Sequence, residues 1–343
     1  MTLATALEAW GIGGARVERA PSGLIQETWF ADVPGRERLV VQRMHPIFGE
    51  AVLEDLEVVT EHLAARGMAT PRLVRTRDGA RGWRDVDGML WRALVWLPGY
   101  TVDRMRGPAM ARAAGELVAA FHAATADCDH QMRFTRAGVH DTAAHLAKLE
   151  RLLPDGSQEV RSLGERILTA GRGLAGDLAS FAALPRRLTH GDLKISNVLF
   201  TTDDRAFALI DLDTLGRLDL AYELGDAWRS WCNPLGEDVT DTRFDLTIFE
   251  AAAAGYLGGG RIGRDEAQAL VAGIHAVCVE LAARFAADAV EDRYFGWDPA
   301  RFPSRRAHNL VRAAGQLRLA EEVAAARGPA ERSVARLTGG WYA

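Results

Sequence analysis

One stretch decides how this sequence is interpreted: His190-Gly191-Asp192-Leu193-Lys194-Ile195-Ser196-Asn197, which is followed by the apolar run Val198-Leu199-Phe200. A second apolar run lies at hairpin distance and ends in Leu209-Ile210-Asp211-Leu212-Asp213. The pattern predicts a short strand, a loop and a second strand over residues 188–212, with polar side chains next to the strands. The chain has only two lysines, Lys148 and Lys194, and the second of them lies in this stretch. Because arginine is used elsewhere, that lysine indicates a chemical need.

The polar residues of this stretch have the spacing of the catalytic loop and the metal-binding aspartate of protein kinases. Phosphoryl transfer requires a carboxylate that orients the attacking hydroxyl and accepts its proton, together with metal ligands and a cation. We expect Asp192 to be this base and Lys194 to be the cation. Asn197 and Asp211 offer the oxygen ligands that Mg²⁺ prefers. Asp213 would lie on the same face as Asp211 in an extended segment, which makes it a candidate ligand for a second metal ion.

Length and composition are those of an ordinary globular protein, because 343 residues with 48% hydrophobic and 25% charged side chains suffice for two lobes. The net charge of -5 and the interleaved arginines argue against a nucleic-acid partner. The longest apolar stretch, residues 267–279, is too short to cross a membrane. Three cysteines without a CxxC pair suit a reducing compartment. We therefore expect a cytoplasmic protein without a membrane partner, and the sequence does not indicate its oligomeric state.

Strand and helix patterns divide the chain into two parts. The first part has strand patterns and one helix pattern, and Pro98-Gly99 ends it; these patterns cover residues 23–30, 38–44, 51–66, 72–76 and 90–97. Alanine-rich helical patterns then dominate, over residues 109–125, 142–153, 158–183 with an interruption near 171–176, and most of 245–327. This order predicts an α+β, protein-kinase-like bilobal fold. Its small β-rich lobe would be residues 1–97 and its large, mostly helical lobe residues 98–343.

These motifs carry a resemblance to a known family. His190-Gly191-Asp192 with Asn197 and Ile210-Asp211 resembles the aminoglycoside phosphotransferase and choline kinase superfamily, and the resemblance covers nearly the whole chain. Within this superfamily the chain is similar to the N-acetylhexosamine 1-kinases. This second likeness rests on several shorter patterns: Val41-Gln42-Arg43-Met44, Trp91-Arg92-Ala93-Leu94, Asp211-Leu212-Asp213-Thr214, Gly225-Asp226 with Arg229, Arg284-Phe285, Tyr294-Phe295, and Asn309-Leu310 with Arg312 and Gln316.

The resemblance implies nucleotide-binding residues in the first part of the chain. Relatives place a phosphate-binding cation on the third strand, where this chain has Arg43. Its partner should lie on the following helix, as either Glu54 or Glu57. Gly23 belongs to the loop that would cover the phosphates, and the backbone of Val95 to Leu97 would form the hinge that contacts adenine.

The resemblance also implies residues that contact the acceptor. Arg284 and Tyr294 match positions that contact the sugar in N-acetylhexosamine 1-kinases, although Arg284 could equally pair with Asp288 at i+4. Asp226 and Arg229 lie one helical turn apart, so they could line the same cleft or pair with each other.

A further implied residue supports the catalytic loop. Relatives usually have an aspartate that braces this loop at the position of Glu223. The extra methylene of Glu223 leaves its bracing role open.

The function implied is an ATP- and Mg²⁺-dependent kinase that phosphorylates a hydroxyl of a small polar acceptor, with a sugar or amino sugar as the first candidate. An aminoglycoside, choline or another amino alcohol is the alternative acceptor. A catalytically silent nucleotide-binding protein is an alternative of another class. A protein kinase is disfavoured, because only about a dozen residues separate Asp211 from Glu223 and leave no room for a peptide platform.

Overall fold

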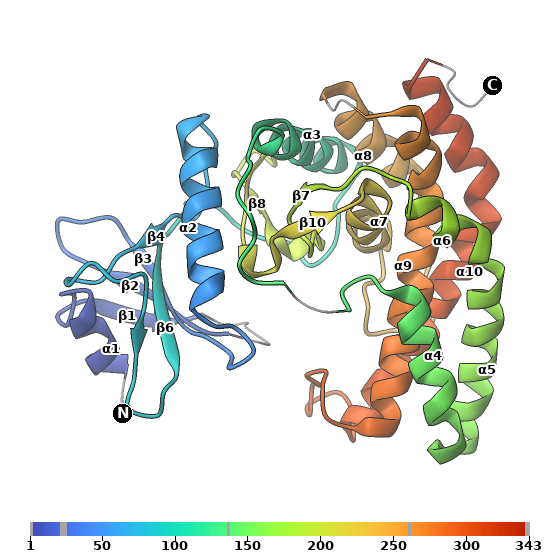
Figure 1. Cartoon of the computed structure of the whole chain (residues 1–343), viewed down its shortest axis with the longest axis horizontal. Coiled ribbons are helices and arrows are strands. Elements are labelled where there is room, and N and C mark those ends of the chain that lie inside the picture. The colour runs from blue at the N-terminus through green and yellow to red at the C-terminus, as the bar shows by residue number, and fades with distance from the viewer. Residues whose placement is uncertain (1–2, 21–25, 136–137, 260–261, 340–343) are drawn as a thin grey trace.

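The structure is a computed structural model, and it describes residues 3–20, 26–135, 138–259 and 262–339. The chain forms a small lobe built on a β-sheet and a larger, mostly helical lobe, which lie side by side along the longest axis (Figure 1). This confirms the predicted kinase-like fold class.

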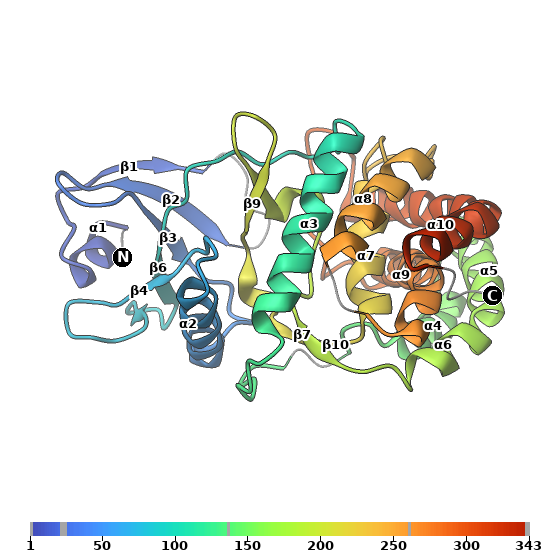
Figure 2. The same cartoon turned by 90° about the horizontal axis from the view of Figure 1, so that it is seen from above.

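The small lobe is one antiparallel sheet with a helix on either side. Its elements are α1 (Leu3–Ala9), β1 (Arg16–Arg19), β2 (Glu27–Asp32), β3 (Leu39–Arg43), α2 (Glu50–Ala65), β4 (Leu73–Val74), β5 (Trp83–Arg84) and β6 (Leu90–Val95). The described strands follow the order β1-β2-β3-β6-β4, and β5 also pairs with β6. Helix α2 lies between the sheet and the large lobe in Figure 1, and Figure 2 shows it on one side of the strands.

Alternation along β3 and β6 assigns their side chains to two faces of the sheet. Val41 and its cross-strand neighbour Ala93 pack in one cluster with Leu7 of α1. Leu94 points to the opposite face and shares a core with Leu56 of α2. A side chain of β3 or β6 therefore faces either α1 or the side of α2 and the large lobe.

The large lobe surrounds a long buried helix. Its helices are α3 (Pro108–Thr125), α4 (Thr142–Leu152), α5 (Gln158–Gly173), α6 (Ala175–Phe181), α7 (Leu220–Trp231), α8 (Leu246–Gly259), α9 (Arg264–Glu291) and α10 (Arg305–Leu337). The predicted interruption appears as the junction of α5 and α6. Helix α9 is long and apolar enough to cross a membrane, but 89% of its most apolar window is buried inside the molecule. A core helix meets the same criteria, so membrane insertion gains only weak support and cellular location stays a prediction.

The predicted strand-loop-strand insertion forms two short hairpin-like pairs. Strand β7 (Arg187–Thr189) pairs with β10 (Gly216–Leu218), and β8 (Val198–Phe200) pairs with β9 (Ala206–Leu209). Helix α7 follows directly and is capped by Asp219, whose side chain accepts a hydrogen bond from Tyr222 N at 3.1 Å. Trp228 and Trp231 of α7 are fully buried, as expected for core residues. These pairs hold the catalytic stretch against α7.

Candidate active site

The loop after β7 has one conformation that its neighbours impose. Gly191 has φ +78°, and a Cβ at this position would lie 2.3 Å from the carbonyl oxygen of Thr214. Glycine is therefore required both by backbone conformation and by space. His190 Nε2 lies 2.9 Å from the carbonyl oxygen of Ile210, and the Thr214 hydroxyl donates to the carbonyl oxygen of His190 at 2.9 Å. The loop is thus tied to the segment that carries Asp211.

Glu223 braces this loop despite its extra methylene. Its two carboxylate oxygens accept the backbone N–H groups of His190 at 2.8 Å and Gly191 at 3.0 Å. His122 Nε2 lies 3.4 Å from the same carboxylate. Burial alone would raise the pKa of Glu223, but His122 and the N–H groups hold this pKa below its usual value. Glu223 is therefore an ionised support beneath the loop.

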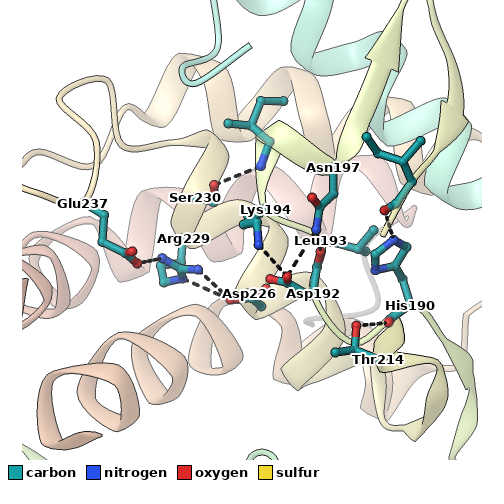
Figure 3. Close-up of polar contacts among 12 residues, drawn as sticks. His190, Asp192, Leu193, Lys194, Asn197, Thr214, Asp226, Arg229, Ser230 and Glu237 are labelled. Atoms are coloured by element: carbon teal, nitrogen blue, oxygen red, sulfur yellow. Dashed lines mark hydrogen bonds and ion pairs between the residues drawn. The ribbon is translucent and has the colours of Figure 1, made fainter. Parts of the chain in front are cut away.

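Asp192, Lys194 and Asn197 meet at one point (Figure 3). Lys194 Nζ donates to Asp192 Oδ2 at 2.7 Å, and Asn197 Nδ2 donates to the same oxygen at 3.2 Å and to the Asp192 carbonyl oxygen at 2.8 Å. Burial opposes the charge of Asp192, but Lys194 lowers the pKa of this carboxyl. Burial likewise opposes the charge of Lys194, and Asp192 with Asp211 raises the pKa of the ammonium. The pair is ionised at neutral pH, so Asp192 can accept a hydrogen bond from a hydroxyl.

The pairing of β8 with β9 brings Asn197 and Asp211 together. Val198 pairs with Leu209, and Ile210 N donates to the Asn197 carbonyl oxygen at 3.0 Å. The amide nitrogen of Asn197 is used by Asp192, which leaves the amide oxygen turned away from that carboxylate (Figure 3). Desolvation by the surrounding protein and the nearby carboxylate of Asp213 raise the pKa of Asp211 to about 6. A buried carboxylate whose charged form is disfavoured in this way suits a hard cation such as Mg²⁺, and Asn197 is its neighbour across the hairpin.

The structure does not leave Asp213 available as the ligand of a second metal ion. The segment after Asp211 is a 3₁₀ turn and not an extended strand, because Asp211 has a left-handed backbone with φ 63°. Asp213 points toward the small lobe, where Arg92 of β6 pairs with both carboxylate oxygens. Gln26 Nε2 adds a hydrogen bond of 2.9 Å. The sequence-based assignment of Asp213 to a metal is corrected on this geometry.

Arg43 does not pair with either predicted glutamate. It lies opposite Glu27 in the ladder of β2 and β3, donates to Glu27 Oε1 at 2.8 Å, and has Asp85 at 3.8 Å. These contacts are on the face of the sheet that packs against α1, away from α2. The residue beside it, Gln42, faces the other way and accepts a hydrogen bond from Arg92 at 2.8 Å. Adjacent residues of a strand point to opposite faces, so Arg43 lies on the α1 face while Gln42 faces Arg92.

Both glutamates of α2 have other partners. Glu54 pairs with Arg133 at 3.2 Å. Glu57 pairs with Arg75 at 2.8 Å and with Arg81 at 2.6 Å. Neither carboxylate is directed at the catalytic loop, so the phosphate-binding pair expected on β3 and α2 is not formed in this structure.

Gly23, Val95 and Leu97 are the other residues predicted to contact the nucleotide. Gly23 lies outside the described residues. The amide of Val95 donates to the Arg72 carbonyl oxygen at 2.9 Å, so this N–H group is already used within the small lobe. Leu97 follows β6 directly, and its role as a hinge contact stays a prediction.

Asp226 and Arg229 of α7 pair with each other beside Asp192 (Figure 3). Arg229 donates to Asp226 Oδ1 at 2.8 Å and 3.1 Å, and to Glu237 at 2.8 Å. The carboxylates of Asp226 and Glu237 outweigh burial and raise the pKa of Arg229. Of the two sequence-based alternatives, the pairing is the one observed, and Asp226 also contributes to the raised pKa of Lys194.

A pocket of about 370 Å³ contains Arg284 and Tyr294. It lies where α4, α9, the segment after α9 and the connection between α3 and α4 meet, and Ile47 of the small lobe completes it. Its lining mixes aromatic rings with both signs of charge: Phe134, His145, Lys148, Arg284, Asp288, Glu291, Tyr294 and Phe295. The two acceptor residues predicted from resemblance therefore share one pocket.

Arg284 pairs with a buried glutamate instead of with Asp288. Glu280, one turn earlier on α9, is fully buried and lies 3.7 Å from Arg284, 3.4 Å from His140 and 4.0 Å from His145. Burial opposes ionisation of Glu280, but His140 and Arg284 lower its pKa. Asp288 is occupied by backbone N–H groups, including that of Tyr294 at 2.8 Å.

Several residues of this region were not assigned by sequence reasoning. Arg92 had a detectable signal, because it is a charged residue within the otherwise apolar strand β6. Lys148 also had one, because it is one of two lysines and lies on α4 toward the pocket. Glu280 had none, since an acid within an apolar helix is not distinguished from a surface residue by its spacing.

A single protein-family model matches most of the chain. The model of a family described as "Phosphotransferase enzyme family" matches residues 16–270. Among curated proteins, the chain is 30% identical to a homoserine kinase of Granulibacter bethesdensis over 241 residues, which are 69% of this chain and 67% of that protein. It is 31% identical to a homoserine kinase of Methylobacterium nodulans over 201 residues, and this match spans 57% of either protein.

Comparison with solved structures supports the same fold. A microcompartment-associated aminopropanol kinase superposes with a TM-score of 0.68 at 18% identity, covering 95% of this chain and 97% of that one. At this identity the likeness concerns the fold alone.

Proposed function

This chain belongs to the phosphotransferase enzyme family, and from that premise we propose that it transfers the γ-phosphoryl group of ATP to a hydroxyl of a sugar or amino sugar. The coarser activity, an ATP-dependent phosphotransferase with a small-molecule hydroxyl as acceptor, follows from the family and from the homoserine kinase relatives. One observation carries the proposal: Asn197 is bound to Asp192 through its side chain and to Ile210, the neighbour of Asp211, through its backbone. The chain also forms a pocket with polar and aromatic lining.

Asp192 is the proposed base. Its carboxylate is ionised, is oriented by Asn197 and Lys194, and can accept a hydrogen bond from the attacking hydroxyl. Orientation of the hydroxyl is the larger contribution, because in a loose transition state the proton leaves late. Lys194 would balance charge on the transferred group, since its raised pKa makes it a permanent cation.

Asn197 and Asp211 are the proposed Mg²⁺ ligands. Within the described residues no group of three or more His, Cys, Asp or Glu side chains is placed to hold a metal ion. Two protein ligands are sufficient for Mg²⁺ in such sites, because nucleotide phosphates and water supply the others. Bound there, the ion would neutralise charge on the phosphates. The raised pKa of Asp211 is consistent with this assignment, because a bound cation would oppose both its causes, desolvation and the repulsion from Asp213.

The pocket favours a neutral polyhydroxylated acceptor over a polycation. Its permanent cations, Lys148 and Arg284, equal its two carboxylates, Asp288 and Glu291, in number. Burial lowers the pKa of His145, so this ring is neutral at pH 7. One of those carboxylates, Asp288, is already bound by backbone N–H groups. Arginine and lysine can donate to hydroxyls, and aromatic rings can pack on the apolar face of a sugar. A polycationic aminoglycoside would find both carboxylates already bound, because Glu291 pairs with Lys148.

Homoserine or a related amino alcohol is the second candidate acceptor. The homoserine kinase relatives support it, because their similarity extends over 69% of this chain. The pocket also contains a charge pair suited to a zwitterion, Lys148 with Glu291 at 2.7 Å. Such an acceptor would use both charges of that pair, whereas a neutral sugar would need neither.

An ADP-release assay with Mg-ATP tests this proposal. The acceptors are N-acetylhexosamines, hexosamines, neutral sugars, homoserine, choline and aminoglycosides, and the Asp192→Ala variant is the control for contaminating activity. We expect turnover with an N-acetylhexosamine or hexosamine, and a raised KM for that sugar in the Arg284→Gln variant. Turnover with homoserine alone would replace the sugar by the second candidate. No turnover with any of these acceptors would contradict both.

A further inference from the structure

The connection between α3 and α4 forms one wall of the acceptor pocket and is held from the other lobe. Residues 127–135, called here the connecting segment, run beside α2 (Figure 1). Phe134 and Thr135 of this segment line the pocket together with Ile47. The wall that faces the acceptor is therefore built on contacts with the small lobe.

One buried carboxylate makes these contacts. Asp55 of α2 is 3% exposed and receives hydrogen bonds from three groups of the connecting segment. Its Oδ1 accepts from Arg133 N at 2.8 Å and lies 2.7 Å from His130 Nε2, while Oδ2 accepts from Phe134 N at 2.8 Å. Arg133 N also lies 3.1 Å from Oδ2, so each carboxylate oxygen takes part in two of these interactions. Both oxygens are therefore needed.

The hydrogen bonds place the ring of Phe134. Phe134 packs against a small core formed by Met44, Phe48, Val52, Leu53 and Leu90, with its ring 5.7 Å from that of Phe48. The backbone N–H of Phe134 is held by Asp55, so the ring position and the backbone position are determined by the same lobe. A loosened backbone would move Phe134 and Thr135 relative to α9 and its pocket residues.

We infer that Asp55 is a positioning residue for acceptor binding: from the small lobe, it fixes the pocket wall formed by Phe134 and Thr135. This rests on the proposed function, in which the pocket holds the acceptor. It assigns to α2 a different task from the phosphate-binding pair expected of Glu54 and Glu57. The helix uses its buried acid to shape the acceptor site, and not to hold a nucleotide-binding cation.

The test compares Asp55→Asn with Asp127→Asn. Asparagine has one acceptor oxygen, so its amide nitrogen would oppose an N–H group that Asp55 now binds. Asp127 is the matched control, because it also joins this segment to α2, through Arg66, but its side chain is 68% exposed. In Asp55→Asn we expect the KM of the acceptor to rise about tenfold, with the KM of ATP changed less than about twofold. The control should leave both values within about twofold of wild type.

A parallel rise in both KM values, or no rise in either, would overturn the inference. His130→Ala removes a single interaction of the same carboxylate and replaces Asp55→Asn if that variant does not fold; we expect about a threefold rise in the acceptor KM alone. If wild type turns over no acceptor, the proposed function fails, and hydrogen exchange decides the inference separately. Faster exchange at residues 127–135 in Asp55→Asn, but not in Asp127→Asn, would support it, and unchanged exchange would reject it.

Discussion

At the scale of single residues, the chemistry depends on which atoms a side chain has left to use. Asn197 gives its amide nitrogen to Asp192, which leaves the amide oxygen for a cation. Lys194 neutralises the same carboxylate and keeps it ionised. Asp213, by contrast, has both oxygens occupied by Arg92 and Gln26. Residues only two positions apart in sequence, Asp211 and Asp213, are therefore suited to different tasks.

Replacement of Asp192 should remove turnover and spare nucleotide binding. In Asp192→Ala we expect kcat to fall by at least about 10²–10⁴-fold, because the acceptor hydroxyl loses both its orientation and its base. Nucleotide affinity, measured by calorimetry with ADP, should stay close to that of wild type. Asp203→Ala is the matched control, since Asp203 is a 64% exposed carboxylate in the β8–β9 turn. Near-wild-type turnover in Asp192→Ala would remove the base assignment.

At the scale of elements, the face of a strand or helix decides what a side chain can reach. Arg43 and Gln42 are adjacent on β3, but Arg43 pairs with Glu27 on the α1 side and Gln42 with Arg92 on the opposite side. Residues of helix α7 likewise have different partners: Glu223 binds the loop after β7, whereas Arg229, nearly two turns later, pairs with Asp226. The elements themselves are predictable from periodicity, whereas the partner of each face is not.

The Glu223 brace should give the fold a specific pH dependence. The pKa of Glu223 is lower in the folded chain than its usual value of 4.5, so its ionised form stabilises the fold above pH 4.5. This contribution is lost as the pH falls through the lowered folded pKa. Glu223→Gln should therefore lower the free energy of unfolding by about 1–3 kcal/mol at pH 7. The difference from wild type should shrink below pH 4.5.

Thermal unfolding across this pH range measures the effect. Glu165→Gln is the control, because Glu165 is exposed on α5 and should change unfolding little at any pH. A difference between wild type and Glu223→Gln that is constant with pH would show that the pKa of Glu223 is not lowered by folding.

At the scale of the whole molecule, the lobes are joined by buried polar contacts as well as by apolar packing. Arg92 of β6 and Asp213 of the large lobe form an ion pair in which both side chains are 2% exposed. Leu56, Val59 and Leu63 of α2 belong to the same core as the large lobe. The predicted division at residue 97 stays a prediction. Helix α2 lies before this residue in sequence, but its buried side chains belong to the core of the large lobe.

Breaking the Arg92–Asp213 pair should destabilise the protein strongly. Asp213→Asn leaves the buried guanidinium of Arg92 without a counter-charge, which should lower the free energy of unfolding by about 3–5 kcal/mol. The double variant Arg92→Met with Asp213→Leu should recover most of that loss, because no buried charge remains. Urea unfolding of the single and double variants gives the coupling energy.

The exposed pair of Arg106 and Asp204 supplies the control for that cycle. Its side chains are 58% and 48% exposed, so Arg106→Met should cost less than about 1 kcal/mol. Equal losses in Asp213→Asn and Arg106→Met would contradict the importance assigned to burial of the first pair.

The sequence by itself determined the elements and the chemistry of the catalytic stretch. Strand and helix periodicity are local properties, so β2, β3, β4 and β6 of the small lobe, the break between α5 and α6, and the hairpin at residues 188–212 were predictable. The short strands β1 and β5 were not predicted. The spacing of Asp192, Asn197 and Asp211 is local as well. A short hairpin necessarily brings the last two together, once Val198 pairs with Leu209.

Only the tertiary structure decided the partners across long separations. Arg43 pairs with Glu27 because both lie on the same face of the sheet, and Asp213 pairs with Arg92 of the other lobe. Asp55 is hydrogen-bonded by a segment 75 or more positions away. Such pairings depend on which faces meet when the lobes pack, and no spacing along the chain records that. The arrangement of Asp192, Asn197 and Asp211 therefore follows from the sequence, while the residues that support it and the wall of the proposed acceptor pocket follow from packing.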